Sequence, residues 1–177
     1  MPLIPTREAA IEILTSVMPA HRGYRARTFE HGWVLRAIHT NTEAQQGLTV
    51  GSPAYVVDSE TGYIYMYPSW AVTMVIKAYL EYKQTGHKTA GRQIYPYQWQ
   101  ISPQKLREDD QTIEYQMTAR SLTNPPEPTI EHPITLEKNN YRNRPTDSMS
   151  AAAASHVRWI AMNRNKGSWP QTDQMQR

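Results

Sequence analysis

Apolar side chains recur at helical spacing in three segments of the chain. The first segment follows Thr6, which suits a helix N-cap, and places Ala10, Leu14 and Val17 on one side. The last segment contains an alanine run at 151–154, which has high helix propensity. We therefore predict helices over 7–18, from Ser69 to about Thr85 with Gly86 as C-cap, and over 149–163 after Asp147 or Ser148.

Between the helices, the spacing changes to the alternation that is typical of β-strands. A run over 28–40 has one solidly apolar face that includes Trp33. Two short runs, 54–57 and 63–67, are joined by a five-residue loop ending in Gly62, which predicts a hairpin. Runs over 93–101 and 112–122 predict an antiparallel pair buried on one face. The connections are a polar loop over 41–53 and a linker over 102–111 that can form a helical turn.

This order of elements predicts the α+β class. We expect a single antiparallel sheet of about five strands, packed by an N-terminal, a central and a C-terminal helix. Residues 1–123 then form the α+β domain, and residues 124–147 form a proline-rich extended connection. Residues 148–177 form the C-terminal helix and a polar tail, which we expect to pack on the same domain.

Charge is distributed unevenly along the sequence. The chain of 177 residues has a formal charge of +3, and its isoelectric point is about 9.1. Residues 1–136 hold 12 basic and 13 acidic side chains, whereas residues 137–177 hold 7 basic and 3 acidic ones. The basicity therefore belongs to the C-terminal part, and the body of the protein is close to neutral.

Composition excludes several classes of protein. The chain has no cysteine, which rules out disulfides, thiol nucleophiles and thiolate metal sites. No segment approaches the roughly 18–20 continuous apolar residues of a membrane span, and the first residues do not resemble a signal peptide. We therefore expect a cytoplasmic protein that does not contact a membrane.

No catalytic motif is present in the sequence. There is no glycine-rich phosphate loop, no Gly-x-Ser-x-Gly and no His-Glu-x-x-His. The six histidines are scattered, and none are paired at the spacing of helical metal ligands. We expect no cofactor, no metal and no enzymatic activity. An enzyme whose site is assembled from distant residues, with Glu108, Asp110 or His39 as candidates, remains the alternative.

Two charged clusters and one aromatic series could contact a partner. Glu108, Asp109 and Asp110 form the densest acidic cluster, which could steer the protein onto a basic partner. Arg22, Arg25 and Arg27 alone are too few for ordinary nucleic-acid affinity. A nucleic-acid-binding adaptor that uses them together with the basic C-terminal region is a further alternative. The aromatic series Tyr95, Tyr97 and Trp99 could form either an interaction face or part of the core, and Pro96 favours an edge strand.

Two stretches resemble a known family. They are Glu30-His31-Gly32-Trp33-Val34-Leu35-Arg36, and the run from Leu48 to Tyr65 that contains Gly51-Ser52-Pro53 and Val57-Asp58-Ser59-Glu60-Thr61-Gly62. Together they resemble the YrhB-like, immunity protein 35 family over about residues 7–86. The resemblance marks seven structural motif residues: Gly32, Trp33, Gly51, Pro53, Asp58, Thr61 and Gly62.

The resemblance implies that the protein is an immunity protein in competition between bacteria. Such a protein binds a cognate toxin that acts in the cytoplasm and covers its active site, in an expected 1:1 complex. We expect the toxin-binding residues to be Glu108, Asp109 and Asp110 for a cationic partner, Tyr95, Tyr97 and Trp99 as anchors, and Arg142 and Arg144 for an acidic rim. The identity of the toxin and the oligomeric state of the chain are left open.

Overall fold

The computed structural model describes residues 3–47 and 51–177, which divide into two compact units. Unit 1 is Met1–Pro96 and unit 2 is Tyr97–Arg177. The α+β class is confirmed, but the single sheet is wrong, because each unit has its own antiparallel sheet of five strands. The boundary between the two units, after Pro96, lies inside the expected domain 1–123.

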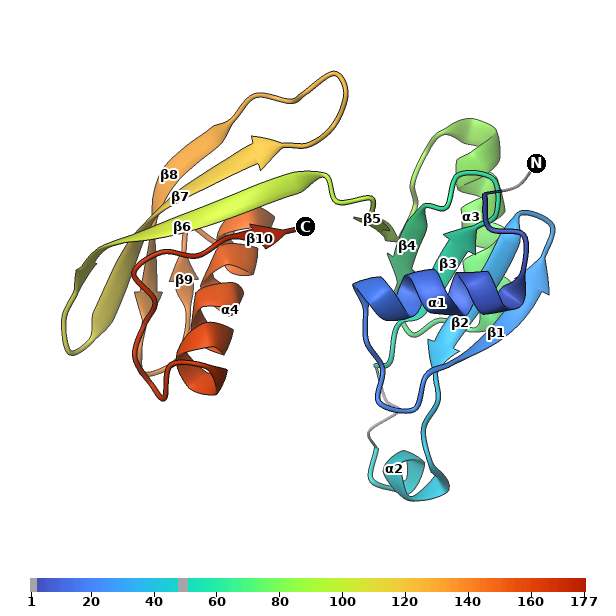
Figure 1. Cartoon of the computed structure of the whole chain (residues 1–177), viewed down its shortest axis with the longest axis horizontal. Coiled ribbons are helices and arrows are strands. Elements are labelled where there is room, and N and C mark those ends of the chain that lie inside the picture. Colours follow the sequence, from blue (N-terminus) through green and yellow to red (C-terminus); the bar gives the residue numbers. More distant parts are fainter. Residues whose placement is uncertain (1–2, 48–50) are drawn as a thin grey trace. The chain divides into compact units, whose positions relative to one another are not determined.

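Unit 1 is a three-layer structure with a helix on each face of its sheet (Figure 1). The sheet has the strand order β1-β2-β3-β4-β5. Its elements in chain order are α1 (Arg7–Val17), β1 (Tyr24–Phe29), β2 (Gly32–Ala37), α2 (Asn41–Gln45), β3 (Ala54–Asp58), β4 (Ile64–Tyr67), α3 (Val72–Thr85) and β5 (Arg92–Tyr95).

Alternation along the central strands produces the two cores of unit 1. Leu35 and Val57 pack under α1, whereas Val34 and Val56 pack under α3. Every residue of β3 is therefore buried. This explains why residues 54–57 form a continuous apolar run and do not alternate.

The predicted start of α1 and the predicted end of α3 are confirmed, but the predicted start of α3 is not. The Thr6 hydroxyl accepts the Ala9 N–H at the start of α1, and Gly86 ends α3 in the left-handed conformation. Ser69 was wrong as a cap, since Ala71 occupies that position without a side-chain hydrogen bond. The run over 28–40 is not one strand but the end of β1 and the whole of β2, which form a hairpin.

Unit 2 is a two-layer structure in which α4 covers one face of a sheet with the order β10-β6-β7-β8-β9 (Figure 1). Its elements are β6 (Trp99–Glu108), β7 (Thr112–Ser121), β8 (Ile130–Glu137), β9 (Asn143–Arg144), α4 (Ser148–Asn163) and β10 (Met175–Gln176). The linker expected over 102–111 is instead most of β6 and its turn into β7. The connection expected over 124–147 contains β8 and β9.

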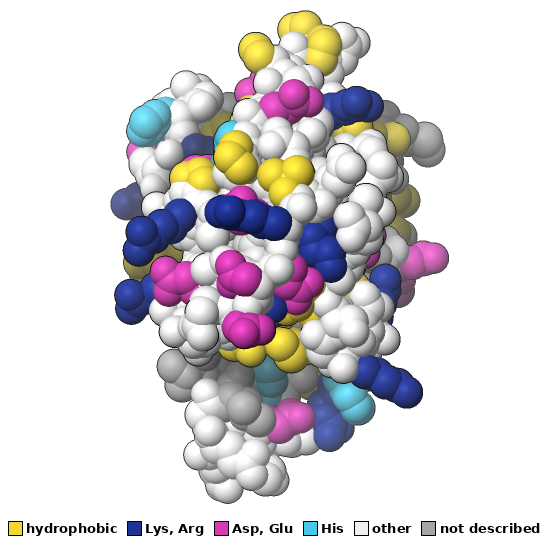
Figure 2. All heavy atoms as spheres, turned by 90° about the vertical axis from the view of Figure 1, so that its left-hand side faces the viewer, with side chains coloured by type: hydrophobic (Ala, Val, Ile, Leu, Met, Phe, Trp, Pro, Cys, Tyr) yellow, Lys and Arg dark blue, Asp and Glu magenta, His cyan; other side chains and the backbone are white. Residues whose placement is uncertain are grey.

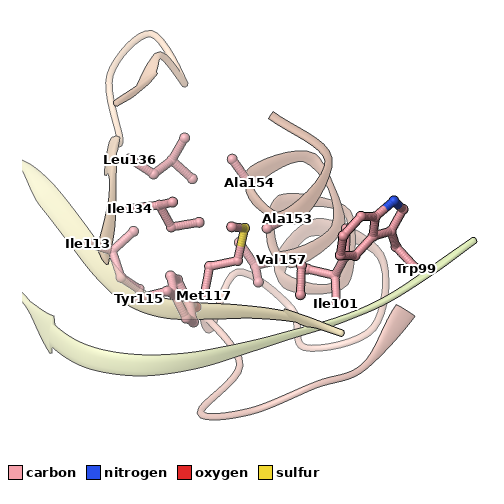
Figure 3. Packing of buried hydrophobic residues seen from close by; sticks show 11 residues of the cluster. Trp99, Ile101, Ile113, Tyr115, Met117, Ile134, Leu136, Ala153, Ala154 and Val157 are labelled. Atoms are coloured by element: carbon pink, nitrogen blue, oxygen red, sulfur yellow. The ribbon is translucent and has the colours of Figure 1, made fainter. Parts of the chain in front are cut away.

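The core of unit 2 lies between the sheet and α4 (Figure 3). Met117 and Ile134 extend from β7 and β8 toward Ala153 and Val157 of the helix. Alanine on the helix lets its backbone approach the sheet closely. At the start of α4, the Asp147 carboxylate accepts the N–H groups of Met149 and Ser150, which confirms Asp147 as the N-cap.

Candidate functional site

Gly32, the first motif residue, lies where two strands approach each other closely. It pairs with Asp58 across β2 and β3, and its φ is +144°. A Cβ atom placed on Gly32 would lie 2.1 Å from the carbonyl oxygen of Val57. No side chain fits that space, so the close approach of the two strands requires glycine. Trp33, the next residue, is partly buried against the core under α1.

Asp58 organises the turn between β3 and β4. Its Oδ1 accepts the N–H of Glu60 at 2.9 Å, the N–H of Thr61 at 2.8 Å and the Thr61 hydroxyl at 3.0 Å. Gly62 then donates its N–H to the Asp58 carbonyl and has a φ of +70°. The motif Asp-x-x-Thr-Gly is therefore the hydrogen-bonding pattern of this turn.

The second oxygen of Asp58 joins the turn to α3. Oδ2 accepts hydrogen bonds from the Tyr79 hydroxyl and, at 3.0 Å, from Nζ of Lys83. Lys83 also reaches Glu60 at 2.9 Å. The Asp58 side chain is 1% exposed. Burial raises the pKa of Asp58, but the hydrogen bonds from Tyr79, Thr61 and Lys83 outweigh it and lower that pKa to about 2.

Two further motif residues lie ahead of β3. Gly51 is exposed, has a φ of +80° and would place a Cβ in open space. Pro53 is partly buried and immediately precedes the strand. Residues 48–50, which belong to the stretch that carries the resemblance, lie outside the described residues. The seven motif residues are thus explained by strand approach, core packing, loop shape and turn geometry.

The acidic cluster lies at the turn between β6 and β7, where lysines neutralise part of its charge. Glu108 pairs with Lys105 at 3.0 Å and with Lys138 at 2.8 Å, and these hydrogen bonds contribute to a lowered pKa of Glu108. Asp109 accepts the N–H groups of Gln111 and Thr112, so it repeats the turn geometry of Asp58. Asp110 is exposed. The cluster is therefore a surface of mixed charge and not a bare acidic patch.

Arg142 and Arg144 lie at the same end of unit 2 as the acidic cluster. The segment from β8 to β9 is held to the turn of β6 and β7, because Lys138 donates its backbone N–H to the carbonyl of Gln111. Both arginines are exposed, and Arg144 lies 3.7 Å from Glu137. Figure 2 shows acidic side chains gathered on this side of the molecule with basic side chains beside them.

The three predicted aromatic anchors have different surroundings. Tyr95 and Tyr97 are partly buried, whereas Trp99 is 9% exposed and packs in the core of unit 2 with Ile101. Trp99 therefore stabilises the sheet and α4, and its ring is not offered to a partner. The alternation that placed Trp99 with the tyrosines did not reveal that a new unit begins at Tyr97.

Trp159 was missed by the sequence analysis. It lies on α4 and is 49% exposed, and Met162 nearby is 48% exposed. The guanidinium of Arg164 lies 4.9 Å from the Trp159 ring centroid. An exposed tryptophan beside an arginine is a residue pair that protein interfaces often use. The helical spacing could have revealed that Trp159 is exposed, because this residue lies on the side of α4 opposite the buried apolar residues.

Three histidines lie near carboxylates without contacting them. The distances are 4.0 Å from His39 Nδ1 to Glu43, 3.8 Å from His132 to Asp147 and 3.8 Å from His156 to Asp173. These N···O distances are longer than a hydrogen bond. None of the three histidines is therefore hydrogen-bonded to the carboxylate beside it. Glu108 and Asp110, the other catalytic candidates, lie at the charged turn of unit 2. Within residues 3–47 and 51–177, no cluster of histidine and carboxylate side chains could hold a metal ion.

In the part of the chain that the structure describes, no helix is both long enough and apolar enough to cross a membrane.

One comparison with known proteins gave a match, and it falls within unit 1. The family model of the immunity protein 35-like domain matches residues 6–87, which lie within unit 1 and include all seven motif residues. Comparison with curated proteins and with solved structures gave no match. Residues 6–87 therefore match the immunity protein 35-like domain, the family that the two motif stretches resemble, and residues 88–177 lie outside that match.

Proposed function

We propose that the protein is an immunity protein that binds a cognate bacterial toxin in the cytoplasm and neutralises it by covering its active site. The observation that carries this proposal is the immunity protein 35-like domain over residues 6–87. Binding requires a stable surface and no chemistry from the immunity protein. The motif residues fit this role, since they act on the fold: Gly32 permits the strand pairing and Asp58 ties a turn to a helix.

The charged end of unit 2 is the proposed toxin-binding surface. We define it by Asp110, with its neighbours Glu108 and Asp109, and by Arg142 and Arg144. These side chains are exposed and come from segments that the fold brings together. A surface with both signs of charge gives a partner orientation as well as attraction. Tyr95 and Tyr97 remain proposed contacts, and Trp159 joins them in place of Trp99.

The function is tested by expressing the protein together with the toxin encoded beside it. We expect growth to be restored and the two proteins to elute together from a sizing column. A matched control is the Asp58→Asn variant, which we expect to weaken unit 1 while leaving the charged end of unit 2 unchanged. Continued growth arrest with no complex, although the wild-type protein is soluble, would contradict the proposal.

Charge reversal at the proposed surface should slow association with the toxin. We expect Asp110→Lys combined with Arg144→Glu to lower the association rate about tenfold or more at low salt, because electrostatic steering acts mainly on this rate. The folded structure should persist, since both side chains are exposed. Surface plasmon resonance measures the rate, with Glu127→Lys as a control at another exposed acidic position. If the double variant and Glu127→Lys associate with the toxin at equal rates, the interface lies elsewhere.

A further inference from the structure

Unit 1 contains a small pocket that neither the family match nor the proposed function explains. Its volume is about 290 Å³, and it is lined by Arg25, Arg36, Ala37, Ile38, His39 and Ser52. It is thus built from β1, from β2 and the residues after it, and from the segment that precedes β3. Two arginines and a histidine are an unusual concentration of cationic and potentially cationic groups for so small a space.

The two arginines lie opposite each other in the sheet. Arg25 pairs with Arg36 across β1 and β2, so both side chains leave the same face. Like charges placed directly opposite in this way destabilise a strand pair unless an anion lies between them. The carboxylate of Glu43 lies 3.6 Å from Arg22 and 4.0 Å from His39. This carboxylate also accepts the N–H of Thr40.

Arg36 has buried hydrogen-bond donors that an anion would satisfy. Its Nε and Nη2 atoms are buried and have no hydrogen-bond partner among the described residues. A buried donor without an acceptor is costly, and a charged one more so. Nε–H and Nη2–H project from the same edge of the guanidinium group. This edge binds the two oxygens of a carboxylate or phosphate with two parallel hydrogen bonds.

We infer that this pocket binds a small oxyanion, with Arg36 as the residue that grips it. Arg25 supplies a second positive charge from the opposite strand. Ser52 and His39 supply further polar atoms at the wall, where the Ser52 hydroxyl lies 3.2 Å from Nε2 of His39. The volume suits one phosphate or carboxylate group with a small substituent. The inference concerns unit 1 alone and does not depend on the proposed toxin.

The experiment titrates the full chain with inorganic phosphate and, separately, with acetate, at constant ionic strength. The NMR signal of the Arg36 Nε–H group reports binding directly. We expect it to shift in a saturable way with a dissociation constant of about 1 mM for at least one probe. Saturation by phosphate alone indicates a phosphate ligand, and saturation by acetate alone a carboxylate. A signal that does not saturate with either probe overturns the inference.

Variants separate this site from general attraction to a basic surface. Arg36→Met should abolish the saturable binding and raise Tm by several degrees in buffer without either anion, because it removes the unpartnered buried donors. Arg36→Lys should weaken binding at least about tenfold, since an ammonium lacks the two parallel N–H groups. Arg27→Met, at an exposed position of β1, the strand that pairs with the strand of Arg36, should leave binding unchanged. Equal loss of binding in Arg27→Met would contradict a specific site.

Discussion

Replacement of Gly32 by alanine should destabilise unit 1 more than any other single methyl addition among the motif glycines. The added Cβ would lie 2.1 Å from the Val57 carbonyl oxygen and 3.0 Å from the Ser59 nitrogen. Both atoms belong to the backbone, so relief requires β2 and β3 to move apart. We expect the free energy of unfolding to fall by about 3 kcal/mol or more, from this overpacking and from the positive φ.

Gly51→Ala is the matched control for this effect. Gly51 also belongs to the motif and also has a positive φ, but a Cβ there meets no atom within 4 Å. We expect a loss of about 1 kcal/mol, which is the cost of the backbone conformation alone. Urea titrations followed by two-dimensional NMR report on each unit separately. Equal losses in Gly32→Ala and Gly51→Ala would show that strand approach is not what Gly32 provides.

Asp58→Asn should also weaken unit 1 strongly, and it should change how stability depends on pH. The amide can replace one carboxylate oxygen but presents a donor or a neutral oxygen to Tyr79 and Lys83. We expect a loss of about 3 kcal/mol at neutral pH, as when one partner of a buried ion pair is removed. The turn bonds to Thr61 are retained if the amide oxygen faces them.

The sign of the pH effect follows from the lowered pKa of Asp58. Its folded value is about 2 and its ordinary value is 3.8. The carboxylate therefore contributes stability that is present above pH 4 and is lost as the pH falls toward 2. This contribution amounts to about 2 kcal/mol. Wild-type unit 1 should lose it between these pH values, and Asp58→Asn should not.

Asp109→Asn provides the comparison in unit 2. Asp109 accepts two backbone N–H groups and a threonine hydroxyl, as Asp58 does, but it lies in an exposed turn without a tyrosine partner. We expect a much smaller loss of stability in unit 2. Similar losses in the two variants would contradict the role assigned to Tyr79 and Lys83.

Local signals in the sequence predicted much of unit 1. The N-cap at Thr6, the left-handed cap at Gly86 and the hairpin around Asp58 depend on neighbours within a few residues, and all three are confirmed. The family resemblance rests on these same local features. Asp58 was read as a turn residue alone, because its contact with Tyr79 joins positions that no local pattern connects.

The second sheet could not be predicted in this way. Residues 93–101 alternate without interruption, yet β5 pairs with β4 in one sheet and β6 pairs with β7 in another. The choice of partner depends on which face α4 covers, and α4 comes about 50 residues later. For the same reason, the sequence suggested Trp99 as a toxin-binding anchor, although α4 and the sheet of unit 2 bury it.

Division into two units also changes the meaning of the basic isoelectric point. Unit 1 has 9 basic and 7 acidic side chains, and unit 2 has 10 basic and 9 acidic ones. Neither unit is strongly basic, because the C-terminal cations share unit 2 with Glu108, Asp109 and Asp110. Charge matters locally in this protein, at the pocket of Arg36 and at the turn between β6 and β7.

A titration of the purified toxin with this protein tests the central proposal most directly. The proposal predicts that toxin activity falls linearly with added protein and reaches zero at one equivalent, because each molecule covers one active site. Light scattering on the same mixture should give the mass of a 1:1 complex. Full toxin activity at several equivalents, or complete loss at a small fraction of one equivalent as a catalyst would produce, would contradict the account.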